Sequence, residues 1–113
     1  MKSKIFALSK NEEFKKLLKQ KKISNKYVTI FFGNLSNKNN QKLNMSFVTK
    51  KKIGNAVKRN KIKRRLRNII NEAVKKLLVK FDYSYLVIAK STMLNNEYKN
   101  IKKTIFQDLE KII

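Results

Sequence analysis

The chain has 113 residues, a formal net charge of +22 and a hydrophobic share of 42%. This length allows one domain with a modest core, and the apolar content is too high for a disordered basic tail. The absence of Cys removes disulfides and thiolate zinc sites, and no stretch approaches the ~20 apolar residues of a membrane span. We therefore expect a single folded basic domain over residues 1–113 that acts in the cytoplasm on a polyanionic partner.

The first half of the chain predicts one helix followed by strands. Apolar residues spaced i, i+3 and i+4 predict a helix over residues 10–21. The β-branched and aromatic run 27–32 and the alternating run 43–49 are typical of strands. We expect these two strands to pair as an antiparallel hairpin across a long polar loop. A further short strand at 23–25 has only a weak signal.

The second half predicts a long helix, a buried strand and a C-terminal helix. An apolar stripe of period 3.6 indicates the helix over residues 57–80, with Lys61 and Arg64 opposite the stripe. The apolar run 83–89 is typical of a strand buried on both faces, and residues 98–112 form an amphipathic helix. The fold class is therefore α+β: a small sheet of three to four strands packed with three helices, with a strand–helix–strand (βαβ) crossover between parallel strands.

The arginines are concentrated in one short segment. The chain has 25 lysines but only four arginines, and all four lie within nine residues. Lysine is a flexible point charge, whereas arginine is a planar fork that pairs bidentately with phosphate. Residues 50–67 hold ten basic side chains and no acidic one, so no glutamate at i, i+4 stabilises them as an ordinary solvated helix face. This segment therefore predicts contact with a nucleic-acid backbone. The four arginines are Arg59, Arg64, Arg65 and Arg67.

Several aromatic side chains fall on the first helix and the two following strands. Most of them are expected to pack in the core, but one or two exposed rings would offer stacking surfaces for unpaired bases. The aromatic group comprises Phe14, Tyr27, Phe31, Phe32 and Phe47.

Catalysis by this chain alone finds almost no support. Without His or Cys the usual general bases, thiolate nucleophiles and metal ligands are missing. The seven carboxylates are scattered, and the adjacent Glu12 and Glu13 are better explained as partners of a helix N-terminus. We therefore predict no catalytic residue and no metal ligand in the chain, and any chemistry would be performed by a partner.

The segment KKIGNAVKRNKIKRRLR, residues 51–67, resembles the signature of the bacterial ribonuclease P protein family. That signature is a long helix opening with an Arg-Asn-Arg-x-x-Lys/Arg-type run after a Lys-rich Gly-Asn-Ala-Val connection. Lys61 stands where the pattern has Arg, and the resemblance extends over nearly the whole chain. The positions that match the pattern are Arg59, Asn60, Lys61, Lys63, Arg64 and Arg67.

The resemblance implies a ribonucleoprotein endonuclease that removes the 5′ leader from precursor tRNA. The catalytic RNA, with Mg²⁺ ions that it holds, performs the hydrolysis, and the matching positions of the signature helix contact that RNA. A cleft between the first helix and the sheet takes the single-stranded leader, and the crossover is left-handed, against the usual rule. The residues assigned to the leader are Phe14, Leu18, Tyr27, Lys50, Lys51 and Lys52.

One alternative stays open at this point. A ribosomal or other structural basic nucleic-acid-binding protein, with no part in catalysis, would share the charge and the small α+β fold. Under the first interpretation the partners are the catalytic RNA and precursor tRNA, with no membrane and no small-molecule substrate.

Overall fold

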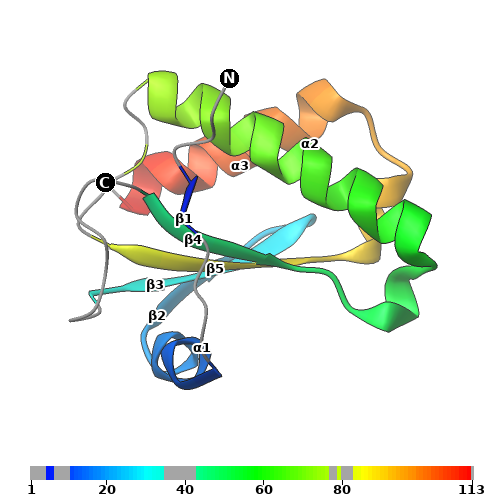
Figure 1. The fold of residues 1–113 in the computed structure, drawn as a ribbon. Coiled ribbons are helices and arrows are strands. Elements are labelled where there is room, and N and C mark those ends of the chain that lie inside the picture. Colours follow the sequence, from blue (N-terminus) through cyan, green and yellow to red (C-terminus); the bar gives the residue numbers. More distant parts are fainter. Residues whose placement is uncertain (1–4, 7–10, 35–42, 77–78, 80–82, 113) are drawn as a thin grey trace.

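The protein folds as a β-sheet between helices. The computed structural model describes residues 5–6, 11–34, 43–76, 79 and 83–112. Within these residues a five-stranded mixed sheet has α1 on one face and α2 and α3 on the other (Figure 1), which confirms the α+β class. The elements are β1 (Ile5–Phe6), α1 (Asn11–Leu18), β2 (Lys21–Ser24), β3 (Val28–Gly33), β4 (Leu43–Val48), the 3-10 turn η1 (Lys51–Ile53), α2 (Ala56–Lys75), β5 (Ser84–Ala89), the 3-10 turn η2 (Ser91–Leu94) and α3 (Tyr98–Ile112).

Strand β5 lies at the centre of the sheet, whose strand order is β1-β4-β5-β3-β2. It pairs in parallel with β4 and antiparallel with β3. The predicted hairpin between residues 27–32 and 43–49 is therefore wrong, because β5 separates those two strands. The physical reason is burial: β5 is apolar along most of its length, and a central position between two helical layers covers both of its faces.

The connection from β4 through α2 to β5 is the crossover expected from the sequence. The parallel pairing of Asn44 with Ser84 and of Val48 with Ile88 confirms the βαβ unit. Helix α2 begins after Asn55, whose side-chain Oδ1 accepts a hydrogen bond from the backbone N–H of Lys58 at 3.0 Å. The left-handed sense that the family resemblance implies stays a prediction.

Two short edge strands bring the sheet to five strands instead of the three or four expected. β2 overlaps the short strand predicted at 23–25 and pairs antiparallel with β3. It exposes Lys21 and Lys22 at the edge of the sheet. β1 pairs in parallel with the start of β4. A two-residue strand has no periodicity of its own, so only its long-range pairing identifies it.

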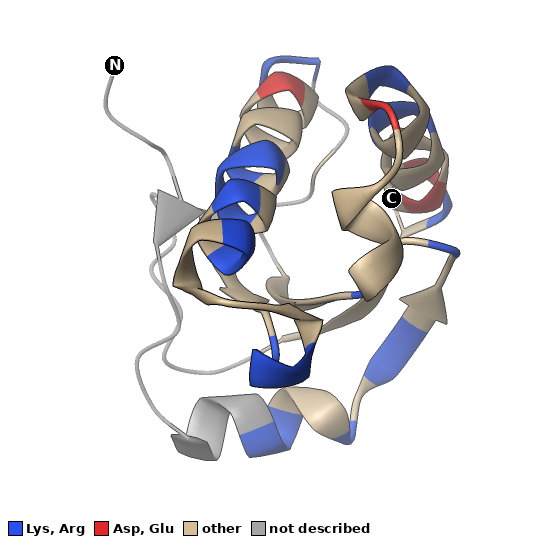
Figure 2. Cartoon of the chain, turned by 90° about the vertical axis from the view of Figure 1, so that its right-hand side faces the viewer, with Lys and Arg blue, Asp and Glu red and all other residues tan. Residues whose placement is uncertain are grey.

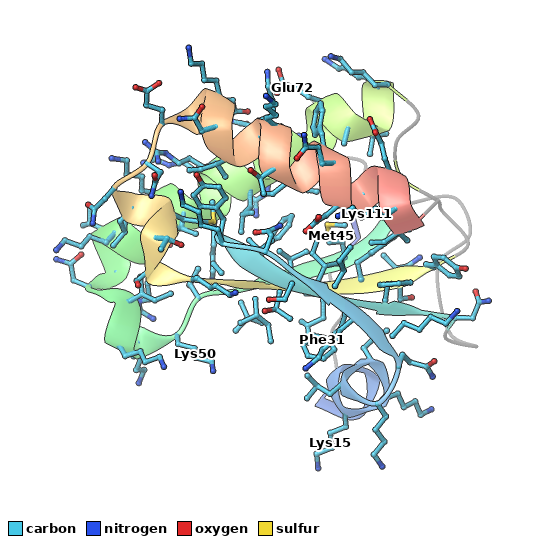
Figure 3. The ribbon with its side chains drawn as sticks, turned by 180° about the vertical axis from the view of Figure 1, so that it is seen from behind. Lys15, Phe31, Met45, Lys50, Glu72 and Lys111 are labelled. Atoms are coloured by element: carbon cyan, nitrogen blue, oxygen red, sulfur yellow. The ribbon has the colours of Figure 1, made fainter. Side chains whose placement is uncertain are left out.

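The two faces of the sheet are covered unequally. On one face α2 and α3 bury the main core, to which Leu66, Ile69 and Ile105 contribute with at most 1% of their surface exposed. Figure 3 shows Met45 pointing to this side and Phe31 pointing toward α1 on the other. The α1 side has a small second cluster centred on Leu17. Because α1 has only eight residues, part of the sheet on its side stays accessible to a ligand.

Candidate nucleic-acid interface

The outward face of α2 carries a shallow basic hollow of about 460 Å³, called here the α2 hollow. Its residues recur at spacings of three and four, which places them on one side of the helix, away from the apolar stripe that packs on the sheet. Four of the six residues that the signature predicted for RNA contact are therefore brought together. The α2 hollow is lined by Val57, Asn60, Lys63, Arg64 and Arg67.

The other two predicted residues lie outside the α2 hollow. Lys61 is exposed to solvent, so its ammonium group is accessible to a polyanion. Arg59 is half-buried, and its Nε is covered without a hydrogen-bond partner among the described residues. At 100° per residue Arg59 falls on the same side of α2 as Leu66, which explains the partial burial. Their contact with RNA stays a prediction.

Arg65, the remaining arginine of the cluster, bonds within the protein. Its Nη1 donates to the backbone carbonyls of Met93 and Asn96 at 3.0 and 3.1 Å. The Asn96 side chain in turn donates to the carbonyl of Thr92 at 2.6 Å. Arg65 therefore ties α2 to η2 and to the loop that leads into α3. One of the four clustered arginines is explained by tertiary structure and not by nucleic-acid binding.

Replacing Arg65 with lysine should destabilise the fold, because a single ammonium group cannot reproduce the two fork-shaped contacts. Hydrogen bonds to charged groups contribute about 1.5–3 kcal/mol each, so we expect the free energy of unfolding to fall by roughly 1–3 kcal/mol. Urea denaturation in sulfate buffer measures this free energy of unfolding. Arg67→Lys is the matched control, since Arg67 is exposed in the α2 hollow. Equal stability of the two variants would contradict the structural role of Arg65.

A second basic concavity of about 410 Å³, called here the sheet-end cleft, lies where η1 approaches the ends of β3 and β5. Thr29 and Ile88 form part of its wall. Side chains alternate between the two faces of a strand, and these two lie on the face of the sheet that α1 covers. Lys50 and Lys52 from the predicted leader site line it, and Lys51 is exposed beside them. The lining residues are Thr29, Lys50, Lys52, Ile53, Ile88, Ala89, Lys90 and Ser91.

Lys90 is a basic residue of this cleft that sequence reasoning missed. It follows β5, forty residues after Lys50, and no local spacing relates the two positions. Its ammonium group donates to the Ser24 hydroxyl at 3.0 Å and to the backbone carbonyl of Asn25. Asn25 also donates to the buried carboxylate of Asp108 at 2.6 Å. The turn between β2 and β3 is thereby held against α3 and the cleft wall.

The aromatic and aliphatic residues predicted to contact the leader differ in how exposed their side chains are. Tyr27 is only 3% exposed and belongs to the main core, so the prediction that it contacts the leader is wrong. Tyr27 directly precedes β3, an interior strand of the sheet, and its ring lies in the core that α2 and α3 cover. Leu18 is 47% exposed at the end of α1, which leaves it accessible. The side chain of Phe14 lies outside the described residues, and its role stays a prediction.

The basic residues around both concavities have no acidic neighbours in the sequence segments that carry them. Figure 2 shows Lys and Arg on the N-terminal half of α2 and on η1, whereas the far end of α2 and α3 carry Asp and Glu together with further lysines. Five of the seven acidic residues occur from Glu72 onward in the sequence. Both concavities therefore lie in a region of positive potential, which attracts a polyanion over distances of about a Debye length.

An acidic residue of α2, Glu72, connects the two long helices α2 and α3 through its carboxylate. The Tyr98 hydroxyl of α3 donates to the Glu72 carboxylate of α2 at 3.2 Å, and Lys102 lies 3.6 Å from the same carboxylate. Burial, followed by the nearby charge of Glu72 and its hydrogen bond, raises the pKa of Tyr98 to about 12. The Glu72 carboxylate therefore has structural partners and stands apart from the basic surfaces.

The side chains of both concavities are suited to binding a polyanion. Among the described residues, no group of three or more His, Cys, Asp or Glu is placed to hold a metal ion. In the part of the chain that the structure describes, no helix has the length and apolar character needed to cross a membrane. The side-chain hydrogen-bond donors in the two concavities are ammonium, guanidinium, amide and hydroxyl groups, which recognise phosphate and polar edges of nucleotides.

The fold and the two basic concavities define a small nucleic-acid-binding protein. The profile of the family described as Ribonuclease P matches residues 3–113. The ribonuclease P protein component of Bacillus pumilus is 36% identical over 99 residues, covering 87% of this chain and 80% of that protein. That of Mesoplasma florum is 30% identical, covering 87% and 86%. The chain therefore belongs to the ribonuclease P protein family.

The fold agrees with this assignment. The structure of the RNase P protein from Thermotoga maritima superposes with a TM-score of 0.78, at 20% sequence identity, over 96% of this chain and 98% of that one. The family match confirms the resemblance drawn from residues 51–67 and the expected place of the chain as a subunit of a ribonucleoprotein endonuclease with an RNA partner. The alternative of a ribosomal or other structural basic protein is set aside.

Proposed function

We propose that this chain binds the catalytic RNA of ribonuclease P through α2 and the 5′ leader of precursor tRNA through the sheet-end cleft. The observation that carries the proposal is the α2 hollow, where four residues of the family signature converge on one exposed helix face. Guanidinium and ammonium groups held on a rigid helix suit the backbone of a folded RNA. The residues proposed for this contact are Arg59, Asn60, Lys61, Lys63, Arg64 and Arg67.

The leader is proposed to run from the sheet-end cleft across the face of the sheet that α1 covers. Lys50, Lys51 and Lys52 would pair with its phosphates, while Phe14 and Leu18 on α1 would contact its bases. A cleft with cationic walls and an apolar floor suits an unpaired strand, because phosphates and bases are recognised separately. Leu18 has no π-face, so its contribution would be apolar contact without stacking.

Hydrolysis would belong to the RNA. The described residues form no carboxylate cluster for Mg²⁺, so the ions that activate water would be held by RNA phosphates, and this chain would position the substrate. The protein contributes by lowering the repulsion between two RNA molecules and by fixing the leader relative to the cleavage site. The cytoplasm, where precursor tRNA of a bacterium is made, is the proposed location.

Cleavage of precursor tRNA by a ribonuclease P RNA at low Mg²⁺ tests the proposal. We expect the wild-type chain to stimulate cleavage, because its cations replace part of the screening that high Mg²⁺ supplies. A Lys50→Ala, Lys52→Ala variant should lose preference for precursor tRNA over mature tRNA while still assembling with the RNA. No stimulation by the folded wild-type chain would contradict the proposal. Stimulation without any leader preference would contradict the assignment of the sheet-end cleft.

A further inference from the structure

Val57 is an exposed aliphatic residue at the start of α2. It is 75% exposed, and the other large hydrophobic residue exposed among those described is Leu18, at 47%. At 100° per residue Val57 lies on the outward side of α2, opposite Leu66, so core packing does not explain it. Valine, being β-branched, is also a weaker helix former than lysine, the residue that this chain most often uses where a positive charge is needed. Neither packing nor helix stability accounts for a valine at this site.

The residues around Val57 indicate what it could bind. It lines the α2 hollow together with Asn60, Lys63, Arg64 and Arg67, so an apolar surface lies at the N-terminal end of a hollow that an amide and three cations continue along the helix. A surface that binds only phosphates has no use for an aliphatic group in its lining. A nucleotide combines the matching features: a charged phosphate, polar edges, and a flat base or sugar with apolar faces.

We propose that the α2 hollow holds one unpaired nucleotide of the RNA partner, with its base or ribose against Val57 and its flanking phosphates on Arg64 and Arg67. An unpaired nucleotide is required because the base faces of a duplex are covered by stacking. Asn60 is placed to hydrogen-bond a base edge or a 2′-hydroxyl. The proposal rests on the proposed function and adds that α2 recognises the body of a nucleotide as well as backbone charge.

The dependence of affinity on salt separates the two kinds of contact. Losing a phosphate contact flattens the slope of log affinity against log salt concentration, whereas losing an apolar contact shifts the line without changing its slope. Val57→Thr keeps the shape of the side chain and replaces a methyl group with a hydroxyl. We expect it to weaken binding to ribonuclease P RNA roughly three- to ten-fold at every salt concentration, and Val57→Ile to bind as well as wild type or better.

Two further variants complete the experiment. Ala56→Ser makes a similar polar change at the neighbouring exposed residue, which does not line the hollow, and it should bind like wild type. Arg64→Ala reports on the proposed function, because it should weaken binding and flatten the slope. Melting curves in sulfate buffer confirm that all variants fold.

The outcomes are distinguishable. If Arg64→Ala weakens binding and Val57→Thr matches wild type, the nucleotide contact is overturned and the proposed function stands. A changed slope for Val57→Thr would also overturn it, since the effect would then come from phosphate contacts. If Arg64→Ala and Val57→Thr both bind like wild type, the proposed function of α2 fails together with this inference.

Discussion

Replacing Arg64 and Arg67 together with alanine should weaken binding to ribonuclease P RNA by about a hundred-fold at physiological salt. Both side chains are exposed in the α2 hollow, so their loss removes two charge-assisted contacts without opening the core. Contacts of this kind contribute about 1.5–3 kcal/mol each, or roughly ten-fold in affinity or more. The slope of log affinity against log salt should flatten by roughly one unit per lost contact. Filter binding or fluorescence anisotropy over a salt series measures both quantities.

A charge-matched control decides whether position or net charge matters. Lys75→Ala with Lys99→Ala also removes two positive charges, from exposed positions outside both concavities. This pair should cost little affinity. Arg64→Lys with Arg67→Lys keeps the charge and removes the planar fork, so it should restore the salt slope but only part of the affinity. If the Lys75 and Lys99 pair weakened binding as much as the arginine pair, general charge and not the α2 hollow would explain the interaction.

The second large effect concerns folding without an anion. With a net charge of +22, the compact state is opposed by self-repulsion, and the sheet has a thin cover on its α1 side. We expect a largely unfolded far-UV circular dichroism spectrum in dilute cacodylate and cooperative folding when sulfate or RNA is added. A ligand that binds only the folded form at a hundred times its Kd contributes about 2.7 kcal/mol, a large share of the stability of a small domain.

Two comparisons separate specific anion binding from screening. Sodium chloride at the ionic strength of the sulfate buffer should be less effective, because chloride screens charge but bridges several cations poorly. Leu66→Ala removes a fully buried side chain that α2 packs on the sheet, at a cost of about 2–5 kcal/mol, and should shift the sulfate midpoint to higher concentration. A cooperative thermal transition that is the same with and without sulfate would contradict the prediction.

Local patterns in the sequence determined the long elements and the chemistry of the partner. The apolar stripe of α2, the continuous apolar run of β5 and the amphipathic pattern of α3 depend on spacings within one segment, so a single sequence suffices to identify them. The basic segment 50–67 without an acidic residue predicted a polyanionic partner for the same reason. Its residue pattern also led to the family, which the comparisons confirm.

Tertiary structure alone decided which segments meet. β5 enters between β3 and β4 because its two apolar faces need two covering layers, and this choice replaced the expected hairpin. The same pairing brings Lys90 to the cleft with Lys50 and buries Tyr27. Such contacts join residues far apart in the chain and leave no periodic signal in the sequence around either partner.

The arginine cluster of α2 shows what the sequence determined and what tertiary structure decided within a single helix. Its composition predicted recognition of phosphate, but composition does not separate an arginine that faces solvent from one that faces another part of the protein. The packing of α2 against η2 directs Arg65 to two backbone carbonyls, whereas Arg64 and Arg67 turn outward into the α2 hollow. The sequence by itself determined where the charge and the planar donors lie, and the packing of α2 decided which of them remain available for RNA, because a helix buries one side and exposes the other.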